Sequence, residues 1–137
     1  MRILGIDYGT KRVGLALTDP GETMALPYAT LERTTRDRFF FELAAIIDRE
    51  GVEKIVLGLP LTLDGEESLT TRQVRNFSEQ LQRRFERPVV LVDERLSTHA
   101  AKADLDAAGV KKRRQKKVLD QQAAVRILET HLLQNKT

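Results

Sequence analysis

Apolar residues form short runs in the N-terminal part of the chain and recur at helical spacing further on. Residues 3–6 and 13–17 are runs rich in isoleucine, valine and leucine, and a glycine-containing turn separates them. This pattern is typical of the two strands of a β-hairpin. Residues 24–31 fit a third, poorer strand, which Pro27 places toward the edge of a sheet. The N-terminal part therefore predicts an antiparallel meander of three strands.

Two later apolar runs, 55–57 and 89–92, lack the alternating polar residues that mark a strand with one face in water. Such runs predict strands that are buried on both faces, run parallel and are covered by helices. Apolar residues at helical spacing occupy positions 39–47, where Gly51 ends the predicted helix, and positions 74–85. Each buried strand is thus expected to follow a helix.

The order of these elements predicts an α/β fold. Thr34, with Asp37 three residues later, is expected to start the first helix. After the last strand, the pattern predicts a short helix that ends at Ala108 and a final helix over about residues 116–133. An antiparallel meander followed by βαβ units gives a five-stranded mixed sheet with helices on both faces. The sequence has no internal repeat or interdomain linker, so we expect a single domain over residues 1–137.

The composition excludes several classes of protein. The 137 residues include no cysteine, which rules out disulfides, thiol redox chemistry and zinc–thiolate sites. No apolar run approaches the roughly 20 residues that span a bilayer. The N-terminus enters the strand pattern directly, without a signal peptide. We therefore expect a cytoplasmic protein that has no membrane partner.

One segment carries the basic character of the chain. The formal net charge is +3, and it would be −3 without six basic residues that fall within residues 111–117. A local basic cluster indicates an anionic polymer, RNA or DNA, as the partner. A solvated loop or helix start is the alternative, and the sequence leaves both open. This basic cluster consists of Lys111, Lys112, Arg113, Arg114, Lys116 and Lys117.

Three carboxylates fall where a fold of this kind could bind a ligand. Asp7 ends the first strand and Glu94 follows the last one, and open α/β sheets bind ligands outside the carboxyl ends of parallel strands. Asp120 lies in the final helix on a face of small apolar residues, where an acid is unexpected without a function. The competing interpretations are a turn cap for Asp7 and an i,i+4 pair of Asp120 with Lys116.

Together the three acids predict a site for a divalent cation. Ligands that are all oxygen atoms suit Mg²⁺ or Mn²⁺. Two such ions can activate a water molecule and stabilise the leaving oxygen in phosphodiester cleavage. His99 and His131 are expected to be ordinary surface or packing residues, and the sequence has neither a Ser-His-Asp pattern nor a Walker-type loop.

Four blocks of the sequence resemble the YqgF family, which is also called RuvX, and they occur in the order typical of that family. The resemblance covers essentially the whole chain. It implies an RNase H-like fold and a nuclease that acts in maturation of the 5′ end of 16S rRNA. It carries the catalytic and metal-binding roles to Asp7, Glu94 and Asp120, with Asp93 as a further candidate, so the number of metal ions stays open. The blocks are residues 5–14, 58–61, 93–98 and 120–124.

The favoured function is a metal-dependent endonuclease acting on precursor 16S rRNA. One alternative is a Holliday junction resolvase acting on branched DNA, which would need a dimer to present two sites. Another is a non-catalytic nucleic-acid-binding module. A sugar-kinase or actin-like ATPase is disfavoured, because it needs two such domains. The oligomeric state, monomer or homodimer, is left open. The candidate nucleic-acid-binding residues are Lys11, Arg72, Arg95, Lys111, Lys112, Arg113 and Arg114.

Overall fold

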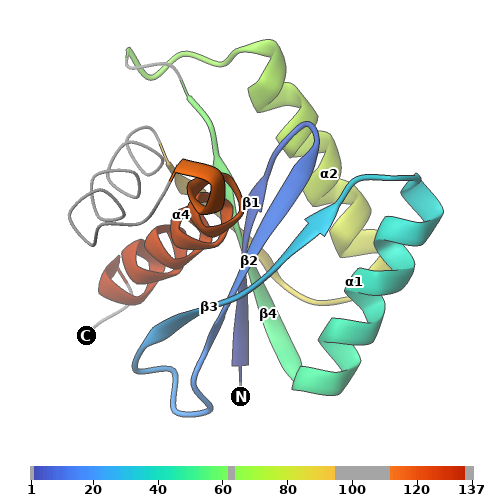
Figure 1. The fold of residues 1–137 in the computed structure, drawn as a ribbon, viewed down its shortest axis with the longest axis vertical. Helices are drawn as coiled ribbons and strands as arrows, with labels where there is room; N and C mark the ends of the chain where they lie inside the picture. Colours follow the sequence, from blue (N-terminus) through green and yellow to red (C-terminus); the bar gives the residue numbers. More distant parts are fainter. Residues whose placement is uncertain (1, 62–63, 95–111, 135–137) are drawn as a thin grey trace.

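A five-stranded mixed sheet lies at the centre of the computed structural model (Figure 1). The strand order is β3-β2-β1-β4-β5, so the first strand of the chain has neighbours on both sides. The β1–β2 and β2–β3 pairs are antiparallel, whereas the β1–β4 and β4–β5 pairs are parallel. The predicted fold class is confirmed. The strands are β1 (Arg2–Tyr8), β2 (Arg12–Thr18), β3 (Ala25–Glu32), β4 (Val52–Leu59) and β5 (Val89–Asp93).

Helices cover both faces of the sheet. Helices α1 (Arg36–Glu50) and α2 (Leu69–Phe85) lie on one face, and α4 (Lys112–Gln134) lies on the other (Figure 1). The structure describes residues 2–61, 64–94 and 112–134, with side chains only from residue 118 onward in the last stretch. No helix in these ranges is long and apolar enough to cross a membrane. The predicted short helix that ends at Ala108 lies outside the described residues.

Helix α1 begins one residue later than the sequence predicts. Thr35, rather than Thr34, is the N-cap, because its hydroxyl accepts a hydrogen bond from the backbone N–H of Arg38 at 3.2 Å. The helix ends at Gly51 as predicted, and the φ of Gly51 is 64°, in the left-handed region that glycine adopts without strain. The apolar spacing of α1 faces the sheet, where Phe39 and Phe40 are buried.

Two other predictions need correction. The final helix starts at Lys112, four residues earlier than expected, so most of the basic cluster forms its first turns rather than preceding it. Lysine, arginine and glutamine are good helix formers, which favours this extension. The strand over residues 89–92 is not buried on both faces. Only Val92 is fully buried, because β5 stands at one end of the strand order.

The alternation of side chains along β1 sorts its residues between the two faces. Leu4 and Ile6 pack in the core beneath α1 and α2, and Tyr8 packs against that core. Ile3 belongs to the core beneath α4. Since successive side chains of a strand point to opposite faces, Asp7 lies on the α4 face and Tyr8 on the α1–α2 face. Asp7 and Tyr8, although consecutive, therefore lie on opposite faces of the sheet at the same edge.

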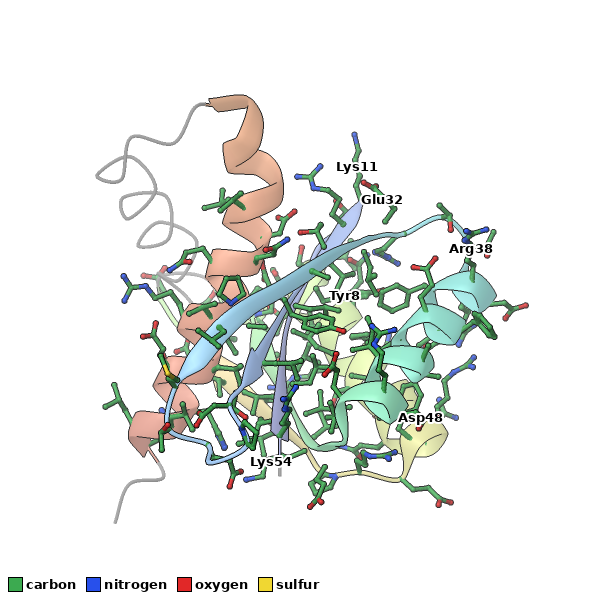
Figure 2. The ribbon with its side chains drawn as sticks, turned by 60° about the horizontal axis from the view of Figure 1, so that its bottom comes forward. Tyr8, Lys11, Glu32, Arg38, Asp48 and Lys54 are labelled. Carbon is green, nitrogen blue, oxygen red and sulfur yellow. The ribbon has the colours of Figure 1, made fainter. Side chains whose placement is uncertain are left out.

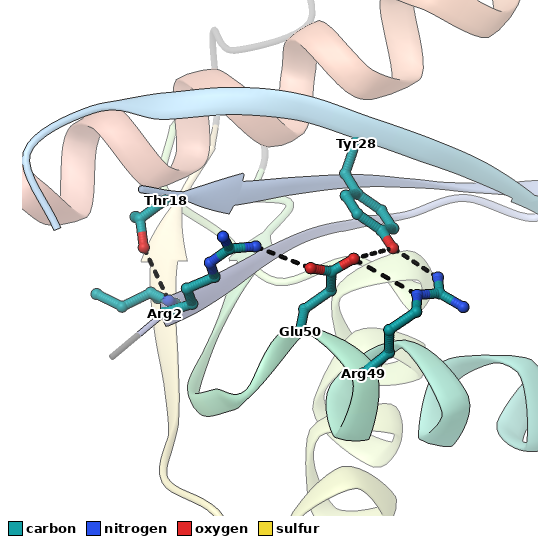
Figure 3. Close-up of polar contacts among 6 residues, drawn as sticks. Arg2, Thr18, Tyr28, Arg49 and Glu50 are labelled. Atoms are coloured by element: carbon teal, nitrogen blue, oxygen red, sulfur yellow. Dashed lines mark hydrogen bonds and ion pairs between the residues drawn. The ribbon is translucent and has the colours of Figure 1, made fainter. Parts of the chain in front are cut away.

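A network of polar contacts holds the N-terminal end of β1 (Figure 3). The Glu50 carboxylate at the end of α1 accepts hydrogen bonds from Arg2 at 2.8 Å and from the Tyr28 hydroxyl at 2.7 Å. Arg49 donates to the same hydroxyl at 2.6 Å. The network joins α1, the central strand and the outer strand β3, and so fixes the sheet at the end opposite Asp7.

Candidate active site

Asp7 and Glu94 meet at the carboxyl ends of the parallel strands. Asp7 is the last residue but one of β1, and Glu94 directly follows β5. The backbone N–H of Glu94 donates to the carbonyl of Leu59 at 3.2 Å, which extends the β4–β5 pairing by one residue and orients the acid. The two carboxyl groups are hydrogen-bonded to each other. The structure thus brings these two acids together, as expected from their places at the ends of parallel strands, while their roles stay predictions.

The pKa values of both acids are raised in this site. Burial, followed by the charge of Asp7, raises the pKa of Glu94 to about 9. Burial also raises the pKa of Asp7, and the nearby charge of Asp120 adds to this shift. The hydrogen bond between the pair lowers the pKa of Asp7 and raises that of Glu94. The pKa of both acids is therefore raised, and Glu94 keeps its proton near neutral pH.

One oxygen of this pair has no donor. Glu94 Oε2 is buried and receives no hydrogen bond from any N–H or hydroxyl group that the structure describes. Gly58 makes room for it, because a Cβ atom at this position would lie only 2.6 Å from that oxygen. A buried acceptor without a partner costs free energy unless a cation or donor satisfies it. The site thus leaves an oxygen lone pair open beside a second carboxylate.

Asp120 approaches the pair from α4 but is bound to another partner. Its Oδ2 lies 2.7 Å from the Nε of Arg12 on β2, a partner that neither sequence interpretation proposed. This hydrogen bond, followed by the charge of Asp120, raises the pKa of Arg12. Within residues 2–61, 64–94 and 112–134, no three acidic or histidine side chains are grouped to hold a metal ion. Two of the three predicted acids are in contact, and the third is near enough to act on Asp7 through its charge.

Close contact between α4 and β2 sets the position of Asp120. A Cβ atom on Gly14 would lie 2.0 Å from the backbone oxygen of Asp120, so only glycine permits the helix to approach this closely. Gly14 is also the residue that pairs with Asp7 across the hairpin. The sequence analysis missed the roles of Gly14, Gly58 and Arg12. A glycine inside a strand pattern is a general sign of close approach and could have indicated the first two.

The turn between β1 and β2, which carries the candidate nucleic-acid-binding residue Lys11, lies at the same edge. The backbone N–H of Gly9 donates to the carbonyl of Arg12 at 3.0 Å, which closes the turn. Lys11 stands at its tip and points away from the body of the protein (Figure 2). Arg72, in the first turn of α2, is exposed. The loop before α2 is closed by a bridge between Leu61 and Glu67, and its residues 62–63 lie outside the described part.

The remaining predicted site residues are described only in part. Arg95 and Lys111 lie outside the described residues, as does His99. The backbone of Lys112, Arg113 and Arg114 forms the start of α4, and their side chains are not described. Asp93 is exposed at the end of β5, and its charge contributes to the raised pKa of Glu94. His131 is buried, in agreement with a packing role. The site assignments as a whole stay predictions.

Comparison with known proteins identifies the family. A family model described as "RuvX: Holliday junction resolvase" matches residues 1–134. The chain belongs to the RuvX family. A RuvX relative from Maridesulfovibrio salexigens, named "Putative pre-16S rRNA nuclease", is 59% identical over 132 residues, which cover 96% of this chain and 98% of the relative. One of the same name from Lawsonia intracellularis is 44% identical and covers 100% of this chain and 96% of the relative.

Solved structures share the fold at low identity. The resolvase of fowlpox virus, determined with Holliday junction DNA, has a TM-score of 0.64 and 11% identity, and 100% of each chain is covered. RuvC of T. thermophilus, also with a Holliday junction substrate, has a TM-score of 0.59 and 15% identity, with 98% of this chain and 95% of that chain covered. The predicted RuvX resemblance and RNase H-like fold are confirmed. The expected enzyme class, a nuclease, is confirmed as that of the RuvX family.

Proposed function

We propose that the chain is a divalent-metal-dependent endonuclease that cleaves precursor 16S rRNA in the cytoplasm, in maturation of the 5′ end. The observation that carries this proposal is the Asp7–Glu94 pair, with its buried Glu94 Oε2 that has no hydrogen-bond donor among the described residues. The RuvX family supports nuclease chemistry. The names of relatives that are 59% and 44% identical support precursor 16S rRNA as the substrate.

The chemistry of the acid pair fits a hard divalent cation such as Mg²⁺ or Mn²⁺. Carboxylate oxygens are the ligands that these ions prefer, and a nearby positive charge would allow both acids to ionise. Asp7 and Glu94 would hold the ion, and Asp120 could join them only by releasing Arg12. A bound cation supplies activation of the attacking water and stabilisation of the leaving oxygen in phosphodiester hydrolysis.

Basic residues around the pair are placed to hold an RNA backbone. Lys11 and Arg72 are exposed at the edge of the sheet, and neither forms an ion pair with a described residue. Helix α4, which carries Asp120, begins beside the hairpin end of the sheet (Figures 1 and 2). Its first turns contain most of the basic cluster. Contacts of lysine and arginine with phosphates position a substrate without reading its sequence, so this edge would orient the RNA.

Branched DNA is the second candidate substrate. The family description names Holliday junction resolvases, and two solved structures with a similar fold contain such junctions. Those two structures are only 15% and 11% identical to the chain. Likeness at that level supports the shared fold and leaves the substrate to experiment.

A substrate and metal series tests the proposed function. Purified protein is incubated with precursor 16S rRNA and with a synthetic four-way DNA junction, each with Mg²⁺, Mn²⁺ or EDTA. We expect cleavage of the rRNA near its 5′ end with either metal and none with EDTA. Metal binding is followed separately by the melting temperature, which should rise with Mg²⁺ or Mn²⁺ because a ligand of the native state stabilises it.

Three outcomes would contradict the proposal. Cleavage of the junction with no cleavage of the rRNA would assign the enzyme to DNA. Cleavage in the presence of EDTA would show that the reaction needs no divalent metal ion. An absence of both cleavage and metal-dependent stabilisation would favour a non-catalytic nucleic-acid-binding module.

A further inference from the structure

A pocket opens on the α1–α2 face of the sheet, across the edge from Asp7. Its volume is about 340 Å³, at the small end of the range for ligand pockets. Tyr8 belongs to it and directly follows Asp7, so the pocket begins within one residue of the acid pair but on the opposite face. Tyr8 and Thr10 of the first sequence block line this pocket, whereas the sequence analysis named none of its arginines. Its main lining residues are Tyr8, Arg33, Arg36, Phe39, Phe77 and Gln80.

A column of three planar groups forms one side of the pocket. The rings of Tyr8 and Phe77 stack with centroids 4.0 Å apart and an interplanar angle of 16°. The guanidinium of Arg33 lies 4.5 Å from the centre of the Tyr8 ring. The same guanidinium donates to the carbonyls of Gly9 and Thr10 at 3.0 and 3.2 Å. Arg33 is thus held in place at the end of the column, although its side chain is exposed.

A second arginine, Arg36, also lines the pocket. Arg36 is the first residue of α1, is exposed, and forms no ion pair with a described residue. The backbone N–H groups at the start of a helix also favour a negative charge. Arg36 therefore offers a guanidinium that a phosphate could occupy.

The positive surface continues away from the pocket. A neighbouring cavity of about 300 Å³ shares Arg36 and Gln80 with the pocket and is further lined by Arg83 and Arg84 of α2. Arg84 lies over the ring of Phe40 at 4.0 Å, which holds it against the surface. The two cavities together form an arginine strip from the sheet edge along the start of α1 and the end of α2.

We propose that the pocket binds an unpaired nucleotide of the nucleic-acid substrate, with its base stacked on Arg33 and its phosphate bound by Arg36. The next phosphates along the strand contact Arg83. Proteins commonly hold unstacked bases on aromatic rings and arginine planes, and the bidentate guanidinium suits phosphate. The inference rests on the proposed function only in that a nucleic acid is the substrate. A strand crossing the edge beside Asp7 would pass from the acid pair into this pocket.

The test is binding of a fluorescein-labelled 12-nucleotide single-stranded RNA, measured by anisotropy in EDTA so that no cleavage interferes. Arg36→Ala is compared with Arg38→Ala, which removes the same charge two residues further along α1. Arg38 is paired with Glu42 at 3.1 Å and does not line the pocket. We expect Arg36→Ala to weaken binding about threefold to tenfold and to reduce the salt slope by ~0.7, the value for one phosphate on a single strand. Arg38→Ala should bind as the unchanged protein does.

A second comparison tests the base. An RNA with one central abasic site should bind about fivefold more weakly than the intact RNA, because stacking on a protein surface is a substantial part of single-strand binding. Arg33→Lys keeps the charge and loses the planar group, so it should remove most of that difference.

Equal effects of Arg36→Ala and Arg38→Ala would overturn the pocket as a binding site. Equal binding of intact and abasic RNA by the unchanged protein would overturn the stacked base. Both measurements are made without metal and without cleavage, so they fail or succeed independently of the proposed nuclease activity. If the unchanged protein fails to cleave RNA while the pocket variants bind RNA as expected, the proposed function is overturned and this inference stands.

Discussion

Two glutamates lie at opposite ends of β1, Glu50 at the end of α1 and Glu94 directly after β5. Their surroundings shift their pKa values in opposite directions. At the N-terminal end, Glu50 receives hydrogen bonds from Tyr28 and Arg2 and lies 3.5 Å from Arg49. The hydrogen bond from Tyr28, with help from the two arginines, lowers the pKa of Glu50. At the other end, Glu94 is buried against Asp7, and its pKa is raised to about 9.

The difference separates a carboxylate that stabilises the fold from one that we propose to be functional. The contacts of Glu50 with Tyr28, Arg2 and Arg49 favour its charged form and outweigh the effect of partial burial, so the network stabilises the fold as it stands. The surroundings of Glu94 disfavour the charged form, and no described residue donates a hydrogen bond to its Oε2, which costs stability unless a cation or another donor satisfies it. Strongly perturbed acids of this second kind gather at functional sites. The comparison therefore indicates the active end of the sheet without reference to any relative.

The largest expected effect is on cleavage. Asp7→Asn should lower the rate of cleavage at least about 100-fold, the scale of losing one group that stabilises transition-state charge. The melting temperature should not fall, because the amide is neutral in a buried site. Asp48→Asn, at an acid near the far end of α1 (Figure 2), is the matched control and should cleave at the normal rate. Full activity of Asp7→Asn would remove Asp7 from the mechanism.

The next effect concerns the contact that positions Asp120. Gly14→Ala should lower the free energy of unfolding by about 2–3 kcal/mol, because the new methyl group forces α4 away from β2 and overpacks the interface. Urea denaturation measures the loss, and cleavage should fall with it at temperatures where the variant is folded. A variant as stable as the original chain would show that α4 can shift freely, and that its close contact does not fix Asp120.

Glu94→Gln should stabilise the protein in the absence of metal. At pH 8 the free energy of unfolding should rise by up to roughly 5 kcal/mol, since pH 8 lies about 3.5 units above the ordinary glutamate pKa of 4.5 and each unit corresponds to ~1.4 kcal/mol. The folded acid keeps its proton while the unfolded one loses it, so the original chain loses stability as pH rises from about 4.5 to about 9. Denaturation in EDTA at several pH values measures this slope, which should be smaller in the variant. An unchanged slope would mean that Glu94 ionises normally.

Glu50→Gln is the matched substitution at the other end of β1. It should have the smallest effect on stability, and it should destabilise the protein, whereas Glu94→Gln stabilises it. The lowered pKa of Glu50 stabilises the fold above the ordinary glutamate pKa, and this contribution is lost as pH falls through the folded value. The melting temperature should therefore decrease at pH 7, whereas the difference from the original chain should vanish in acid. Cleavage should be unaffected. A gain in stability at pH 7 would contradict the comparison of the two ends.

The sequence predicts the fold and the acid pair for the same reason. Runs of apolar residues fix which segments are strands, and topology then brings the ends of β1 and β5 together. The ion pair of Arg12 with Asp120 joins residues 108 positions apart, and no local pattern encodes it. The pocket around Tyr8 and Arg33 depends on stacking across three elements, which composition and spacing do not reveal.

The distance along the chain between the parts of the site has a consequence for its assembly. The strands β1, β2 and β3 pair with their neighbours in sequence, so they close short loops. The link from Arg12 to Asp120 closes a loop of more than 100 residues, which costs more chain entropy and forms later in folding. During synthesis, Asp120 can approach Asp7 only after helix α4 has been made. A growing chain therefore completes the β1–β3 meander well before the proposed active site can form.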